Sequence, residues 1–327
     1  MTAALLPFRP AMGLANAHVQ TIWPSLFRRS PSLPVIREAW PRRLPDVGVV
    51  DMVLLPFKPN KPGVLLLHGL EGSGDASYMR GMMAAVSSAG FNVAALEFHS
   101  CGPTPPSGPQ LYHSGRTDEI AVAVERLTAL WSGQPIAACG FSLGGNALLK
   151  YLGERQDRSP LVAAVGISVP FDLAACAASL DAPGFFAGIY RKRFLKSLRR
   201  KAIAAALAHQ VPFTAEQVMA CQSFRQFDDL VTAPLFGFAS ADDYWARNSS
   251  KPFLTRIVCP TLLISAQDDP FIPASALPLD ITEHNPKVKL EVRAQGGHTG
   301  FLSGSAWNPH YWAETLTVSF LKEHLLR

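Results

Sequence analysis

The stretch ACGFSLGGNALLKYLGE, residues 138–154, places Ser142 between glycines and directly ahead of an apolar segment. In a G-x-S-x-G pattern the serine can act as a nucleophile when the motif forms a sharp turn from a strand into a helix. The glycines then avoid steric clashes, and the serine oxygen projects above the sheet. At roughly 7% glycine usage the pattern arises by chance about 0.1 times in a chain of this length, so its flanking residues decide its meaning.

The residues on either side of Ser142 favour such a turn. PIAACGFS, residues 135–142, is a short apolar run typical of a buried parallel strand. LGGNALLKYLGE, residues 143–154, contains no proline and ends in strong helix formers. We therefore predict that Ser142 is a nucleophile at a strand-to-helix turn, with an ordinary glycine-rich turn as the alternative.

An activated serine needs a histidine base and an acid that orients the histidine. Asp268 and Asp269 end the apolar run TLLISAQDD, and His298 follows in the loop QGGHTGF. The chain order serine, acid, histidine is the order that α/β-hydrolases use. The turn DPFIP favours Asp269 as the acid, with Asp268 as the alternative. If Asp269 is the acid, Asp268 is predicted to lie next to the triad and support it.

The motif HGLEG begins at His68 and follows another predicted strand. A turn at this point can bring a backbone amide to the reacting carbonyl, so the N–H groups of Leu70 and Leu143 are predicted to form the oxyanion hole. His68 is predicted to support this turn through hydrogen bonds and not to act as the base.

Apolar strand-like runs alternate with helical patterns along the chain, as expected for a mostly parallel sheet flanked by helices. Seven runs are predicted strands: residues 49–57, 63–69, 91–98, 135–142, 161–168, 261–269 and 288–294.

The clearest helix is predicted to start after Thr117, which can cap it, while Asp118 and Glu119 favour its positive end. Four apolar residues share one face of this helix and should pack on the sheet: Ile120, Val124, Leu127 and Trp131.

Two regions interrupt this alternation within what is predicted to be a single domain, residues 1–327. Residues 1–45, with scattered prolines, are predicted to form an N-terminal extension. Residues 170–260 separate two successive strands and are too long for a loop. Because their sequence is mostly helical, they are predicted to form a cap over the carboxyl ends of the strands, where α/β sheets bind ligands.

Composition narrows the possible classes of protein. Charged residues make up 17% of the chain, yet no run approaches the eighteen or so apolar residues of a membrane span. MTAALLPFRPAMG has no cation ahead of its apolar stretch, unlike a secretory signal, so a cytoplasmic location is expected. The five cysteines are widely spaced and are predicted to be small core residues. His68, His99 and His113 lack the spacing and carboxylates of a metal site, and neither a metal nor a cofactor is predicted.

The net charge of +5 is concentrated in RKRFLKSLRRK, residues 191–201, which contains seven cations and no acid. Removing these seven charges leaves the rest of the chain at −2, and no nucleic-acid-binding motif accompanies them, so no nucleic-acid partner is predicted. Phe194, Leu195 and Leu198 lie among the cations, and the segment could contact an anionic membrane surface. The alternative is a solvated helix face with a few core contacts.

Several blocks together resemble the YheT-like branch of the α/β-hydrolase superfamily, which is related to the mammalian ABHD esterases and lipases. The blocks are AHVQTIWPSLFRR, LLLHGLEGSGDASYMRG, QLYHSGRTDE, GFSLGGNALLKYLGE, SVPFDLAACA, FDDLVTAPLFGFASADDYW, ISAQDDPFIP and GGHTGF. The resemblance covers almost the whole chain and implies the α/β-hydrolase fold. It also implies a triad of Ser142, one aspartate of the pair Asp268 and Asp269, and His298. Where relatives carry an arginine-glycine-cysteine-serine-glycine turn, this chain has HSCGPTP, so a different pocket wall is expected there.

The reaction that these residues and this resemblance imply is hydrolysis of a small-molecule or lipid carboxylic ester. A thioesterase and an acyltransferase would use the same serine and the same acyl-enzyme, so both remain alternatives. A binding module on the same fold is the alternative from a different class, because fold alone does not determine function.

Overall fold

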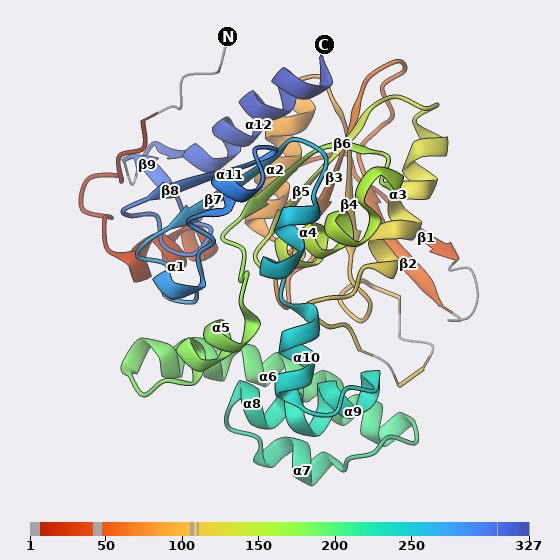
Figure 1. The fold of residues 1–327 in the computed structure, drawn as a ribbon, viewed down its shortest axis with the longest axis vertical. Helices are drawn as coiled ribbons and strands as arrows, with labels where there is room; N and C mark the ends of the chain where they lie inside the picture. Colours follow the sequence, from red (N-terminus) through yellow and green to blue (C-terminus); the bar gives the residue numbers. More distant parts are fainter. Residues whose placement is uncertain (1–6, 42–47, 105–107, 110, 306, 327) are drawn as a thin grey trace.

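The computed structural model describes residues 7–41, 48–104, 108–109, 111–305 and 307–326. An eight-stranded sheet of order β1-β2-β4-β3-β5-β6-β7-β8 runs through the centre of the molecule (Figure 1). The six strands β3 to β8 are parallel to one another, whereas β2 pairs antiparallel with both β1 and β4. The bounds of β1 to β8 in chain order are Ile36–Pro41, Val49–Leu54, Gly63–Leu67, Asn92–Glu97, Ile136–Phe141, Leu161–Ile167, Thr261–Ala266 and Val288–Arg293.

The predicted mostly parallel sheet is confirmed, and each of the seven predicted runs contains one strand. β1 is an additional strand, which lies in the region predicted as an N-terminal extension. A second, two-stranded ladder pairs β9, Leu302–Gly304, with β10, Pro309–Tyr311.

Helices cover both faces of the large sheet because its central strands bury side chains on both sides. In β3, Val64 and Leu66 pack into one core cluster with α2 and α12, whereas Leu65 and Leu67 pack into the other with α3 and α4. The helices around the sheet are α1 Ala17–Phe27, α2 Ser77–Ser88, α3 Asp118–Leu130, α4 Leu143–Arg155, α11 Ile281–His284 and α12 Trp312–Leu325, with 3₁₀ turns at Gln156–Arg158, Lys251–Arg256 and Ala274–Ala276.

The start of α3 differs from its prediction. Thr117 is the residue before the helix, but its side chain makes no capping hydrogen bond, and its hydroxyl donates to Glu154 Oε2 on α4 at 2.8 Å. The predicted cap was wrong because an acceptor on the neighbouring helix takes the hydroxyl. The predicted buried face is confirmed, since Ile120, Val124, Leu127 and Trp131 are all buried in the core.

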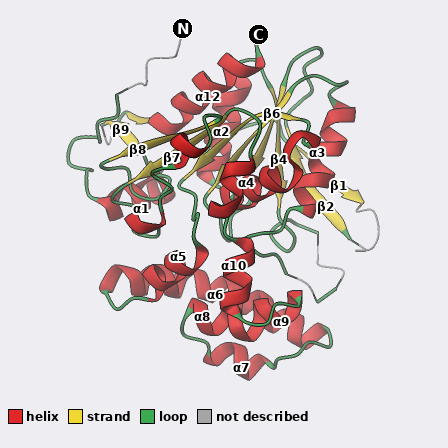
Figure 2. Cartoon of the chain, viewed as in Figure 1, coloured by secondary structure: helices red, strands yellow, loops and turns green. Residues whose placement is uncertain are grey.

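Between β6 and β7 the chain leaves the sheet and forms a helical insertion, which lies as a separate layer of helices and loops in Figure 2. Asn146 of α4 binds its return segment: the side-chain amide donates to the Asn248 carbonyl at 2.8 Å and accepts from the Ser250 amide at 2.9 Å. The insertion consists of α5 Leu173–Asp181, α6 Phe185–Ala208, α7 Ala215–Ala220, α8 Phe224–Phe227, a π-helical turn at Asp228–Thr232, α9 Ala233–Phe236 and α10 Ala241–Asn248.

The N-terminal region is packed against the main body through α1. Gln20 is fully buried, and its side-chain amide donates to the carbonyls of Leu14 at 2.7 Å and Leu302 at 3.0 Å. The same side chain accepts from the Leu302 amide at 2.7 Å. Arg28 forms a 2.6 Å ion pair with Glu314 of α12. These contacts join the N-terminal region to β9 and to α12.

We expect Gln20→Ala to lower the free energy of unfolding by about 2–3 kcal/mol, because it removes three hydrogen bonds to buried backbone groups of Leu14 and Leu302. Urea denaturation followed by circular dichroism measures the change. Ser25→Ala on the same helix is the matched control, since the exposed Ser25 hydroxyl binds only the carbonyl of Ile22. Equal effects of the two substitutions would contradict a stabilising role for the Gln20 contacts.

Candidate active site

Ser142 lies between β5 and α4 with φ 49° and ψ −119°, a backbone conformation that residues with a side chain rarely adopt. Hydrogen bonds hold it on both sides: its amide donates to the Ile167 carbonyl at 2.8 Å, and its carbonyl accepts from the Asn146 amide at 3.0 Å. A Cβ at Gly140 would lie 2.6 Å from the Gly144 carbonyl, and one at Gly144 would lie 2.5 Å from the His68 carbonyl oxygen. Both glycines are therefore required by the packing of the turn.

His298 lies between Ser142 and Asp269. Its Nε2 is 2.9 Å from Ser142 Oγ, and its Nδ1 is 2.9 and 3.1 Å from the two carboxylate oxygens of Asp269. Asp269 also accepts from the backbone amides of Phe271 at 2.8 Å and Ile272 at 3.3 Å. A carboxylate in this position keeps the proton on Nδ1, so that the lone pair of Nε2 faces the serine hydroxyl.

Asp268 makes a different contact. Its Oδ1 accepts from the Gly297 amide at 2.9 Å, and burial raises the pKa of its carboxyl. The geometry thus separates the two neighbouring aspartates: Asp269 contacts the His298 ring, and Asp268 binds the backbone of the loop that carries it.

The loop that carries His298 is also held by α1. The His298 amide donates to Thr21 Oγ1 at 2.9 Å, and a Cβ at Gly297 would lie 2.5 Å from the Ala17 carbonyl oxygen. On the other side the Thr299 amide donates to Ser168 Oγ at 2.9 Å. No role of α1 at the site was predicted from the sequence, although the block AHVQTIWPSLFRR, which contains α1, is one of those that carry the resemblance.

Leu70 and Leu143 both line the cavity beside Ser142. A Cβ at Gly69 would come within 3.2 Å of the Ser142 Cβ, which shows how closely the turn after β3 approaches the serine. His68 fixes this turn, because its Nδ1 is 2.7 Å from the Gly69 carbonyl and its Nε2 accepts from the Phe98 amide at 3.1 Å. Burial lowers the pKa of His68 to about 4, so the ring is neutral near pH 7.

The cavity beside Ser142 has a volume of about 100 Å³ and is lined in part by the helical insertion. A second cavity of about 70 Å³ shares Leu70, Leu143, Phe224 and Tyr244 with it, so the two hollows adjoin. The side chains that the insertion contributes to the first cavity are mostly apolar: Leu173, Cys176, Ala177, Leu180, Phe194, Phe224 and Trp245.

A family model described as an alpha/beta hydrolase fold matches residues 62–305. The chain belongs to this α/β-hydrolase fold family. It is 34% identical over 97% of its length to the Escherichia coli (strain K12) protein named "Putative esterase YheT", of which it covers 94%.

Other relatives of this hydrolase carry lipase names. It is 33% identical to the phospholipase ABHD3 of Mus musculus over 75% of the chain and 59% of that protein. It is 30% identical to a monoacylglycerol lipase of Saccharomyces cerevisiae over 80% of the chain and 59% of that protein. A solved Pyrococcus furiosus esterase shares the fold, with a TM-score of 0.60 at 14% identity over 99% of this chain and all of that one. The chain is thus an α/β-fold hydrolase related to esterases and lipases.

The basic segment of the hydrolase is attached to the turn that carries Leu70. Glu71, at φ 56°, accepts from Lys201 Nζ at 2.8 Å, from the Tyr112 hydroxyl at 2.9 Å and from the Ser197 hydroxyl. The Glu71 amide donates back to the Tyr112 hydroxyl at 2.6 Å. Lys201 and Ser197 belong to α6, so the insertion holds the turn next to Leu70 by an ion pair and a hydrogen bond.

Phe194, Leu195 and Leu198 do not supply the apolar part of the membrane contact predicted for residues 191–201. Leu195 and Leu198 are buried, and Phe194 packs against the same core. For these three residues the alternative, core contacts of a helix face, is what the structure has, and Phe194 and Leu198 line the two adjoining cavities.

Asp228 is a pocket residue that the sequence did not single out. It lines both cavities and is the one acidic residue among the described residues that line them. Its two carboxylate oxygens accept from the Thr232 hydroxyl at 2.6 Å and the Trp245 indole N–H at 2.8 Å. Burial, with a smaller effect of the carboxylates of Asp181 and Asp229, raises its pKa to about 6. Its π-helical turn, a feature that often marks functional sites, is not visible in the sequence.

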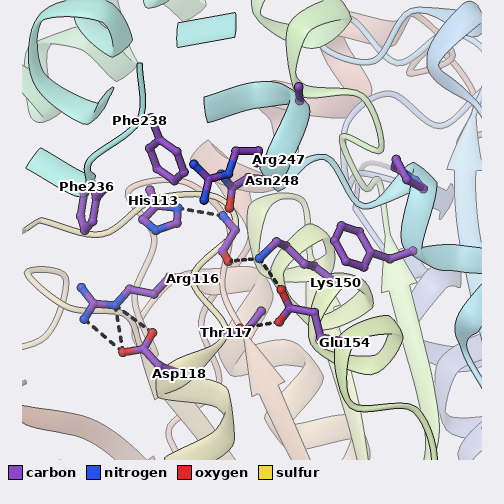
Figure 3. Close-up of a pocket in the computed structure, with 14 residues that line it drawn as sticks. His113, Arg116, Thr117, Asp118, Lys150, Glu154, Phe236, Phe238, Arg247 and Asn248 are labelled. Carbon is purple, nitrogen blue, oxygen red and sulfur yellow. Dashed lines mark hydrogen bonds and ion pairs between the residues drawn. The ribbon is translucent and has the colours of Figure 1, made fainter. Parts of the chain in front are cut away.

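The largest cavity described, about 670 Å³, lies apart from Ser142 and His298, between the core helices and the return of the insertion (Figure 3). Four of its five charged side chains pair with one another: Lys150 is 2.6 Å from Glu154, and Arg116 is 2.9 Å from Asp118. The fifth, Arg247, is 3.5 Å from Asp243, which does not line the cavity. Burial lowers the pKa of His113 to about 3. The lining contains neither Ser142 nor His298.

We expect Asp269→Asn to lower the rate of p-nitrophenyl ester hydrolysis about 10⁴-fold, because an amide no longer favours the Nδ1–H form of His298. Asp268→Asn is the matched control. It keeps an oxygen for the Gly297 amide and should retain the rate within about tenfold. A larger loss in the Asp268 variant than in the Asp269 variant would reverse the assignment.

Proposed function

We propose that this hydrolase cleaves carboxylic esters through a covalent acyl-enzyme on Ser142. The observation that carries the proposal is the continuous hydrogen-bond chain from Ser142 through His298 to Asp269 beside an apolar cavity. An unassisted serine hydroxyl is a weak nucleophile at neutral pH, and an adjacent base that accepts its proton activates it.

In the proposed reaction His298 Nε2 takes the Ser142 proton as the serine oxygen attacks the ester carbonyl carbon. The amides of Leu70 and Leu143 stabilise the oxyanion, and Asp269 stabilises the imidazolium. The tetrahedral intermediate collapses when His298 returns the proton to the leaving alcohol. Water, deprotonated by the same nitrogen, then attacks the acyl-enzyme and releases the acid.

The proposed substrates are esters with a short to medium acyl chain, including lipid esters. Support comes from the apolar lining that the insertion gives the cavity, which favours a hydrocarbon chain over water. Further support comes from the relatives named as a phospholipase and a monoacylglycerol lipase.

Within this reaction Asp228 selects for substrates that carry a cationic or hydrogen-bond-donating group. Each of its carboxylate oxygens accepts one protein hydrogen bond and has a further lone pair. The charged carboxylate attracts an ammonium group and repels an anion, and this preference ends when the carboxyl is protonated.

We expect kcat/KM for butyrylcholine to be about tenfold above that for its uncharged dimethylbutyl isostere when Asp228 is charged. This ratio is the effect of one charge-assisted contact between the ammonium group and the Asp228 carboxylate. Because its pKa is raised to about 6, the ratio should fall as the pH drops through 6. Any effect of pH on the acyl-transfer steps that both esters share cancels in the ratio. Asp228→Asn should give a low ratio at every pH, whereas Asp229→Asn, a change at its exposed neighbour, should keep the high ratio at neutral pH. A ratio that is independent of pH in the native protein would refute the selectivity.

We expect Ser142→Ala to lower kcat about 10⁶-fold, because it removes the atom that attacks the ester. The measurement is hydrolysis of p-nitrophenyl esters of increasing chain length, together with labelling by a fluorophosphonate. The native protein should incorporate one label and the variant none. Labelling without hydrolysis at any chain length would favour acyl transfer to another acceptor. Neither labelling nor hydrolysis would favour a binding module.

A further inference from the structure

Exposed apolar side chains gather where α1 meets the start of α6. Phe185 is 77%, Leu26 64% and Phe27 60% exposed. The two helices touch here, because the Phe186 ring stacks on His18 with a centroid distance of 3.7 Å. The residues of this apolar patch are Trp23, Leu26, Phe27, Phe185, Phe186 and Ile189.

The apolar patch is hollowed by a groove of about 180 Å³. Trp23 and Phe27 of α1 line one side of it, with their rings 4.4 Å apart, and Phe186 of α6 lines the other. A contiguous exposed apolar surface of this kind marks a place where something binds, whereas single exposed apolar residues do not.

The same face of α6 continues as a row of cations. Ile189 is followed at helical spacing by Lys192, Arg193, Lys196 and Arg200, all exposed. These four side chains make no hydrogen bond or ion pair with another described residue, and α6 contains no acidic residue. The other cations of the segment are engaged: Arg191 and Arg199 bind backbone carbonyls, and Lys201 binds Glu71. The four cations of α6 that have no hydrogen-bond or ion-pair partner among the described residues therefore all lie on this face.

We propose that the apolar patch and this row of cations form a docking face for an anionic lipid bilayer. Aromatic and aliphatic side chains bury themselves at the boundary between headgroups and acyl chains, while lysines and arginines bind the anionic headgroups beside it. The charge selects this occupant, because a neutral apolar partner would leave the four cations unpaired, and a second copy of the chain would bring like charges together.

A chain of side-chain contacts runs from the docking face to the candidate active site. His18, stacked on Phe186, has its Nδ1 3.0 Å from the Tyr190 hydroxyl. The Tyr190 ring is 4.7 Å from Phe271, which is 4.3 Å from the His298 ring. Bound in this way, the protein would hold its candidate active site near the lipid. Binding itself does not depend on the proposed esterase reaction.

The docking face differs from a membrane-spanning segment. No single helix in the described part of the chain is long and apolar enough to cross a bilayer, although α5 and α6 together pass by length and composition with a bend of 113° between them.

The test is co-sedimentation of the full chain with vesicles of phosphatidylcholine alone and of phosphatidylcholine mixed with phosphatidylglycerol. We expect binding to the anionic vesicles at least tenfold tighter than to the neutral ones, weakening as salt is added. The double variant Phe185→Ser, Ile189→Ser should lose at least tenfold in binding, and so should Lys192→Glu, Arg193→Glu.

Matched controls place the same changes elsewhere on the surface. Leu207→Ser, Met219→Ser alters two other exposed apolar residues of the insertion, and Lys287→Glu, Lys289→Glu reverses two exposed cations near β8. Both should bind as the native protein does. Ser142→Ala should also bind normally, which separates docking from catalysis.

Three results would overturn the proposal. The first is equal binding of the docking-face variants and the controls, and the second is the absence of binding to anionic vesicles. The third is a concentration-dependent dimer, seen by light scattering, that Phe185→Ser, Ile189→Ser converts to a monomer, since the occupant would then be a second copy of the chain.

Discussion

The close approach of the turn at Ser142 to β3 is the constraint on which the site depends. The positive φ of Ser142 is unfavourable for a residue with a side chain. It persists because hydrogen bonds and close packing with the surrounding sheet hold the backbone in this conformation. The amide of Ser142 is bound by β6, and the glycines on either side leave room for backbone at distances that no Cβ could tolerate. The strain is thus maintained by the core of the protein.

Two segments far from the elbow in sequence complete the geometry. α1 holds the loop that carries His298, and it is itself anchored by Gln20 to β9. α6 holds Glu71, next to Leu70, through Lys201 and Ser197. The serine therefore comes from the end of a sheet strand, whereas the His298 loop is also held by α1 and the turn of Leu70 by α6.

The parts that the sequence predicted are those whose physical cause is local. The central strands β3 to β7 are buried on both faces and stood out as apolar runs. The antiparallel β2 and the outer β8 stood out through alternating apolar residues, and the glycines around Ser142 marked a turn. α1 contains Pro24 in its interior, which argues against a helix even though Val19, Ile22, Trp23, Leu26 and Phe27 have helical spacing. β1 is an edge strand whose side chains are mostly exposed. Both depend on tertiary contacts and were not predicted. Lys201 was missed because its partner Glu71 lies far away in the sequence. Asp228 was missed because it lies in a π-helical turn, which no residue pattern predicts.

The ion pair between Lys201 and Glu71 limits how the cavity beside Ser142 can change size. Lys201 lies in the second half of α6, so displacing that half would also displace the turn that carries Leu70. The first half, from Phe185 to Phe194, has no such attachment to the turn. Variation in cavity size among related chains should therefore be concentrated in the first half of α6 and in α5. The second half of α6 should keep its position, because it contacts both the cavity and the turn that carries Leu70.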